Sequence, residues 1–135
     1  MVKSTTIYEG GLHCSLVHEP SGAMVATDAP VDNNGKGEAF SPTDLVGAAL
    51  AACMSTIMGI VAARKGIALE GMKVEVAKHM SADPRRIGKL EVVINVPLPA
   101  DHPDRQMLEN AALACPVKQS LHPDIEIPIT WNWLG

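Results

Sequence analysis

A long uncharged run in the middle of the chain limits the folds that this sequence can adopt. No charged residue occurs over residues 45–63. Ser41 is a suitable N-cap, Asp44 stands where the acid of a capping box belongs, and Gly66 supplies an end signal. The pattern therefore predicts a helix over about residues 42–65. Because the helix is apolar on every side, we expect it to be a central helix buried along most of its length.

A membrane span is the competing interpretation of this run. The run is built largely from Ala and Gly, contains Ser55 and Thr56, and lies between two regions with strand-like alternation, so we expect no membrane association. Small residues recur at every fourth position, which lets another backbone approach closely. These residues are Gly47, Ala51, Ser55, Gly59 and Ala63. A second copy of the same helix is a plausible partner for this small-residue ridge.

Alternating segments on both sides of the helix predict β-strands. They cover residues 2–8, 12–18 and 23–27 before the helix, and residues 72–80, 88–96 and 125–133 after it. Residues 101–114 predict a second helix that stops before Pro116, where a further short helix can start. The order β-β-β-α-β-β-α-β predicts an α+β fold with an antiparallel β-sheet and helices on one side, in a single domain over residues 1–135.

Composition excludes several functional classes. The net charge is −4 and no basic face is apparent, so nucleic-acid binding is not expected. The five histidines lack metal-ligand spacing and no nucleotide-binding glycine motif is present, so we expect no metal and no cofactor. The number of cysteines is odd, and no secretion signal is recognisable at Met1, so we expect a cytoplasmic protein.

Two cysteines stand in the two predicted helical regions, 62 residues apart (115 − 53). In a reducing compartment a bond between Cys53 and Cys115 should be transient and catalytic, although core packing is the alternative for both thiols. Cys115 stands at a predicted helix start, which favours its thiolate, whereas Cys53 lies about three turns into its helix and needs a nearby cation. Cys14, in an alternating segment, is the odd one out.

Two segments resemble the OsmC/Ohr family of osmotically inducible and organic hydroperoxide resistance proteins. They are residues 40–54, FSPTDLVGAALAACM, and residues 114–121, ACPVKQSL. The resemblance implies a peroxidase, a thiol-dependent hydroperoxide reductase that works as an intertwined homodimer with its sites near the subunit interface. It also implies that Cys53 attacks the peroxide, that Cys115 resolves the product, and that a dithiol reductant of the lipoyl type or a small thiol restores the pair.

The chain departs from the family pattern at two positions. Leu12 stands where an arginine is expected beside the first thiol, and Thr43 stands where a glutamate holds that arginine. Asp44 is acidic and adjacent to Thr43, so it is a third candidate site residue, although its alternative role is helix capping. These departures favour a second hypothesis, an OsmC-like protein with weak or no peroxidase activity that serves as a ligand-binding or redox-sensing dimer.

Overall fold

The computed structural model describes all residues, 1–135, and the chain forms two compact units. One unit covers residues 1–46 and the other covers residues 47–135. The expectation of a single domain over the whole chain stays a prediction.

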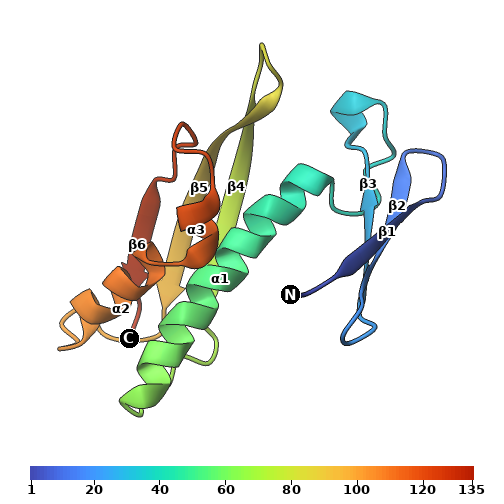
Figure 1. The fold of residues 1–135 in the computed structure, drawn as a ribbon. Helices are drawn as coiled ribbons and strands as arrows, with labels where there is room; N and C mark the ends of the chain where they lie inside the picture. Colours follow the sequence, from blue (N-terminus) through green and yellow to red (C-terminus); the bar gives the residue numbers. More distant parts are fainter. The chain divides into compact units, whose positions relative to one another are not determined.

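The N-terminal unit is a three-stranded antiparallel sheet in the order β1-β2-β3 (Figure 1). Its strands are β1 (Ser4–Tyr8), β2 (His13–His18) and β3 (Met24–Asp28), followed by the short 3-10 helix η1 (Val31–Asn33). The three strands lie within one or two residues of the predicted segments. The predicted meander before the long helix is therefore confirmed.

A strained turn joins β1 to β2. Gly10, Gly11 and Leu12 all have positive φ angles, of 84°, 61° and 60°. Glycine adopts this region readily, whereas a leucine does so only when its surroundings hold it there. The Leu12 N–H donates to the Tyr8 hydroxyl at 3.4 Å, and the Leu12 carbonyl accepts from the Ala29 N–H at 3.0 Å. The backbone of Leu12 is thus held by hydrogen bonds at both its N–H and its carbonyl.

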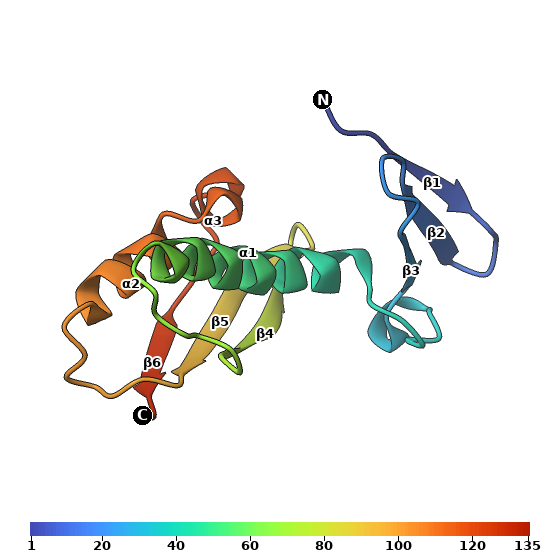
Figure 2. The same cartoon turned by 90° about the horizontal axis from the view of Figure 1, so that it is seen from below.

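The C-terminal unit is a sheet covered on one face by helices (Figures 1 and 2). The sheet has the order β4-β5-β6. Its elements are β4 (Lys73–Ser81), β5 (Arg86–Val96), α2 (Arg105–Leu113), α3 (Pro116–Ser120) and β6 (Ile129–Trp133), and α1 (Pro42–Arg64) leads into them. Figure 2 shows α1, α2 and α3 on the same side of the strands. The predicted long helix, second helix and short third helix are all present.

The prediction of a fully antiparallel sheet is wrong for the last strand. β4 and β5 form the predicted antiparallel hairpin, but β6 pairs with β5 in parallel, with Val92 opposite Ile129 and Val96 opposite Trp133. The chain crosses over the sheet through α2 and α3 before it returns. A crossover of this kind brings the next strand back in the same direction, whereas a tight hairpin reverses it. Strict alternation in the sequence carries no information about direction.

The core of the C-terminal unit lies between α1, α2 and the sheet. Its fully buried residues come from α1, β5, α2 and the start of α3. They include Leu50, Met54, Met58, Leu90, Ile94, Leu108 and Cys115. The alternating burial of β5 places Leu90, Val92, Ile94 and Val96 on the core face. No aromatic side chain is among the fully buried residues of this core, which is built mainly from aliphatic and methionine side chains.

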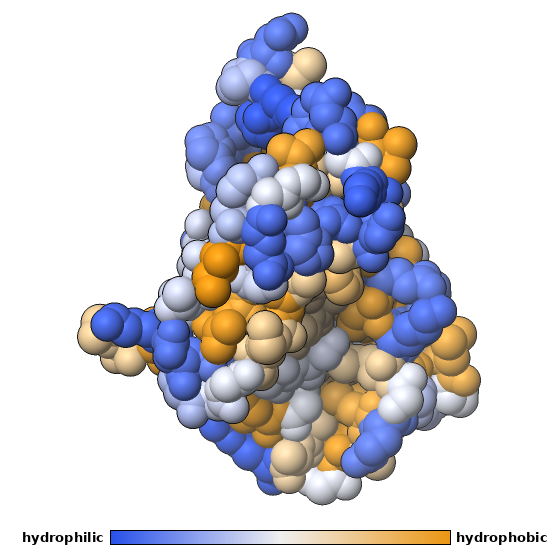
Figure 3. Space-filling model, turned by 90° about the vertical axis from the view of Figure 1, so that its right-hand side faces the viewer, coloured by the Kyte–Doolittle hydropathy of each residue, from blue (hydrophilic) through white to orange (hydrophobic).

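The expectation that α1 is buried along most of its length is wrong for the single chain. Only Gly47, Leu50, Met54, Met58 and Ala62 are buried, and they repeat every three or four residues along one face. The opposite face is apolar but open. Figure 3 shows hydrophobic residues at the surface in patches between hydrophilic ones. α1 is long and apolar enough to cross a membrane, but core helices of soluble proteins meet the same criteria of length and composition.

Candidate functional site: a pair of thiols under the long helix

Cys53 lies on α1, beside the buried face of that helix. It is a free thiol and is partly exposed. Its side chain packs against the hydrophobic core, next to the fully buried Met54. The uncharged sequence around it explains this position, because small and aliphatic residues allow α1 to lie close to the sheet: at Gly47 an added Cβ would already contact Val76 and Leu90 at 3.4 and 3.6 Å.

Cys115 lies at the junction of α2 and α3 and is completely buried. Pro116 occupies the first turn of α3, which ends the preceding helix as predicted. The Cys115 sulfur caps α3, because it accepts a hydrogen bond from the Lys118 N–H at 3.4 Å. The thiol is therefore held in place by its own helix start while its side chain fills the core.

The structure brings the two thiols together. Burial raises the pKa of Cys115 above its ordinary value of 9.0, and a hydrogen bond with the Cys53 sulfur raises it further. The N–H groups of Lys118 and Val117 oppose this effect and lower the pKa. No side-chain cation contributes to the balance. The two N–H groups of the helix start do lower the pKa of Cys115, as expected, but burial outweighs them and the net shift of its pKa is upward.

Asp44 completes the capping box at the start of α1. The Ser41 N–H donates to Asp44 Oδ2 at 2.9 Å, and the Asp44 N–H donates to Ser41 Oγ at 3.1 Å. Ser41 Oγ also lies 3.2 Å from the Thr43 hydroxyl. Along the helix, Asp44 precedes Cys53 by nine residues (53 − 44), or about 13 Å of helical rise. The capping role of Asp44 is shown, and its catalytic role stays a prediction.

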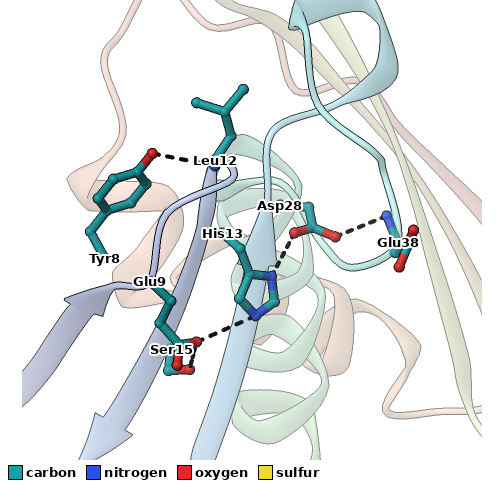
Figure 4. A network of polar contacts seen from close by, with 7 residues as sticks. All are labelled: Tyr8, Glu9, Leu12, His13, Ser15, Asp28 and Glu38. Carbon is teal, nitrogen blue, oxygen red and sulfur yellow. Dashed lines mark hydrogen bonds and ion pairs between the residues drawn. The ribbon is translucent and has the colours of Figure 1, made fainter.

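Sequence reasoning missed a hydrogen-bonded pair of a histidine and a carboxyl group in the N-terminal unit (Figure 4). His13 Nδ1 lies 2.6 Å from Asp28 Oδ1, and Asp28 Oδ2 accepts the Glu38 N–H at 3.0 Å. The hydrogen bond from His13 lowers the pKa of the buried Asp28 carboxyl. His13 Nε2 lies 3.6 Å from Glu9 Oε1, and a hollow of about 350 Å³ adjoins His13 and Asp28. Only the strand register, which pairs His13 with Asp28, reveals this cluster.

Cys14 lies on the other face of the N-terminal sheet. It pairs with Tyr8 on β1 and with Thr27 on β3, whereas its neighbour His13 pairs with Asp28. His13 and Cys14 therefore point to opposite faces of the sheet, because neighbouring residues on a strand alternate. Cys14 is a free, partly exposed thiol, and its strand is part of the other compact unit. No group of His, Cys, Asp and Glu side chains in the chain is arranged to hold a metal ion.

Comparison with known proteins gives one family. The family model described as "OsmC-like protein" matches residues 35–130, more than half of the chain. A Psychrobacter arcticus 273-4 structure, described as an osmotic stress induced and detoxification response protein, is 45% identical with a TM-score of 0.93, covering 98% of this chain and 96% of that one. Comparison with curated proteins finds no match.

More distant structures share the same fold. An organic hydroperoxide resistance protein of Vibrio cholerae, with captopril bound in one of its active sites, is 20% identical with a TM-score of 0.77, covering 99% of this chain and 92% of that one. The organic hydroperoxide resistance protein OhrB of Bacillus subtilis is 21% identical with a TM-score of 0.71, covering 98% of each chain. At these identities the likeness concerns the fold.

Proposed function

The chain belongs to the OsmC-like protein family, and we propose that it is a thiol-dependent hydroperoxide reductase that uses the pair Cys53 and Cys115. The observation that carries the proposal is the pairing itself. Two thiols that are 62 residues apart in sequence lie close enough for one to raise the pKa of the other. Structural neighbours named as organic hydroperoxide resistance proteins support the choice of substrate class.

The chemistry proceeds in three steps. The Cys53 thiolate attacks one oxygen of the hydroperoxide, so that an S–O bond forms, the O–O bond breaks, and the other oxygen leaves as an alcohol after taking a proton. The sulfur of Cys115 then attacks the Cys53 sulfenic acid, which forms the S–S bond and releases water. Two electrons from a dithiol return both cysteines to thiols.

The different environments of the two thiols favour Cys53 as the attacking thiol and Cys115 as the resolving one. Burial keeps Cys115 protonated at neutral pH, because its pKa is raised, so Cys115 does not compete as the first nucleophile. Once Cys53 carries oxygen, the buried thiol lies beside it and loses its proton in the condensation that expels water. Cys53 is partly exposed and can meet a peroxide, whereas Cys115 is not accessible to one.

A homodimer is part of the proposal. The open face of α1 exposes small residues such as Ala52 and Ala63, and the N-terminal sheet exposes Ile7, Tyr8 and Met24. Apolar side chains that gather on an exposed sheet are typical of a surface that another protein surface covers. A second copy of this chain would cover both surfaces, and we place the dimer in the cytoplasm.

Substitution of Cys53 tests the enzyme proposal. We expect Cys53→Ser to abolish peroxide consumption by the purified protein, while Cys14→Ser, the matched control at the unpaired thiol, retains it. Peroxide treatment of the native protein should give an intramolecular bond between Cys53 and Cys115, detected by mass spectrometry. Unchanged peroxide consumption in Cys53→Ser would show that this thiol is not the catalyst.

A redox-sensing or ligand-binding dimer is the second candidate, and Leu12 favours it. In this chain a leucine, held in a strained turn, replaces the arginine that the family pattern places beside the first thiol. We expect Leu12→Arg to speed peroxide reduction at least about tenfold if the native protein is a weak peroxidase, because a guanidinium favours the thiolate. A native protein that is already fast, and that Leu12→Arg does not improve, would argue against the sensing role.

A further inference from the structure

The two sulfurs of the candidate site differ sharply in access. Cys115 is 0% exposed and lies among core residues that include Leu108 and Ala112. Cys53 is partly exposed, and Ala49, one turn before it on α1, is an exposed residue with a small side chain. Four residues of helix bring two side chains to within about 40° of each other around the axis, so Ala49 and Cys53 share one flank of α1.

A thiolate that reduces a disulfide must approach one sulfur from the side opposite its partner. For Cys115 no side is open to solvent: the residue is 0% exposed, it packs among the core residues, and its sulfur accepts the Lys118 N–H of α3 at 3.4 Å. Cys53, by contrast, is partly exposed on a flank of α1. The chain therefore offers one route to the disulfide and blocks the other.

We propose that the reductant attacks the sulfur of Cys53 and that Cys115 is the leaving group. This inference rests on the proposed function and specifies its third step. The first thiolate of a dithiol forms a bond to Cys53 sulfur, the Cys53–Cys115 bond breaks, and Cys115 leaves with the electron pair and takes a proton. The second thiol of the reductant then attacks the mixed disulfide, which releases Cys53 and a cyclic disulfide.

The raised pKa of Cys115 opposes this order, because it makes Cys115 a poorer leaving group, but the burial of Cys115 against an attacking thiolate has the larger effect. A thiol of raised pKa leaves more slowly, and burial raises the pKa of Cys115. The Lys118 and Val117 N–H groups offset part of that effect because they favour the departing thiolate. Attack at a completely buried sulfur requires the core to open first, whereas attack at Cys53 does not. Peroxide and reductant consequently use the same sulfur and the same entrance.

The location of the mixed disulfide tests the order. The peroxide-oxidised protein is treated briefly with glutathione, quenched in acid, alkylated with N-ethylmaleimide and digested with trypsin. The three cysteines fall on separate peptides: residues 4–36 for Cys14, residues 37–64 for Cys53 and residues 106–118 for Cys115. We expect glutathione on the Cys53 peptide and the alkylating group on the Cys115 peptide. Glutathione mainly on the Cys115 peptide overturns the inference.

A matched pair of variants gives an independent reading. Ala49 and Gln119 are both exposed and lie four residues from Cys53 and Cys115 respectively, on α1 and α3. We expect Ala49→Phe to slow reduction of the oxidised pair by dithiothreitol at least about tenfold, and Gln119→Phe to leave it within about twofold. The inference is overturned if Gln119→Phe slows the reduction as much as, or more than, Ala49→Phe.

Failure of this inference is distinguishable from failure of the proposed function. If peroxide does not produce the Cys53–Cys115 disulfide in the native protein, the peroxidase cycle itself is wrong. If the disulfide forms but the adduct lies on Cys115, only the order of thiol exchange is wrong. Disulfide formation by peroxide is therefore verified in the native protein and in both variants before reduction is measured.

Discussion

The sulfur of Cys115 lies beside that of Cys53, and it accepts the Lys118 N–H at 3.4 Å from its own helix. Cys115 is therefore buried, caps α3 and has a raised pKa, whereas Cys53 is partly exposed on α1. Roles in a two-thiol cycle follow from this asymmetry, because the accessible thiol meets both substrates and the buried one acts only within the protein.

Cys115 should titrate above the ordinary cysteine value of 9.0. We expect the Cβ chemical shift of Cys115 to titrate at a higher pH in the folded protein than in the urea-unfolded chain, a measurement that requires no reagent to reach the buried sulfur. Cys53→Ser should shift the midpoint downward, because Cys53 contributes to the raised pKa. Cys14→Ser is the control and should leave the midpoint unchanged. NMR of protein labelled at cysteine measures the midpoint of the titration, and equal midpoints in folded and unfolded protein would contradict the structure.

The same raised pKa makes the fold sensitive to alkali. A group whose pKa is raised in the folded state contributes stability that is present below its unfolded pKa and is lost as pH rises through the folded value. The free energy of unfolding should therefore fall above about pH 9. Cys115→Ala removes this alkaline loss at the cost of a small cavity. Urea denaturation from pH 7 to 10.5 measures both effects, and parallel curves for the two proteins would count against it.

Asp28 makes the N-terminal unit sensitive to acid. Its pKa is lowered by the hydrogen bond from His13, so its contribution to stability is present above the unfolded value of 3.8 and is lost as pH falls through the folded value. We expect Asp28→Asn to be less stable than the native protein at neutral pH and to lose less stability on acidification. The chemical shifts of residues in β2 and β3, followed from pH 6 to 2 in both proteins, measure the pH at which these strands lose their native structure.

Asp44→Asn separates capping from catalysis. An asparagine keeps an oxygen acceptor for the Ser41 N–H, so the free energy of unfolding should change by less than about 1 kcal/mol. Asp44→Ala removes the acceptor and should cost about 1 kcal/mol. Peroxidase activity is measured in the same two variants. A large loss of activity in Asp44→Asn with unchanged stability would assign Asp44 a catalytic role, and unchanged activity would leave it a cap.

The open face of α1 should hold the proposed dimer together. Ala52 is exposed on that face, about 100° around the helix from Cys53. We expect Ala52→Glu to shift the protein from dimer to monomer, because a desolvated carboxylate is not tolerated in an apolar interface. Gln106→Glu, on an exposed position of α2, is the matched control. Sedimentation velocity distinguishes the two states, and a monomeric native protein would reject the dimer outright.

Local sequence was sufficient for most of the elements of the fold. The helix expected at about residues 42–65 is Pro42–Arg64, and its capping box forms between Ser41 and Asp44. These features depend on residues that are close in sequence, so they can be predicted from the sequence alone. The direction of β6 cannot be predicted in this way, because the alternation of side chains is the same in parallel and antiparallel strands.

The sequence by itself determined that the chain has two cysteines in helical settings, and the family motifs around them. Only the tertiary structure decided how each thiol behaves. It buried Cys115 and left Cys53 partly exposed, and it placed His13 against Asp28 across two strands. A pKa depends on burial and on groups distant in sequence, so a local rule such as a helix start is outweighed once the core closes around the thiol.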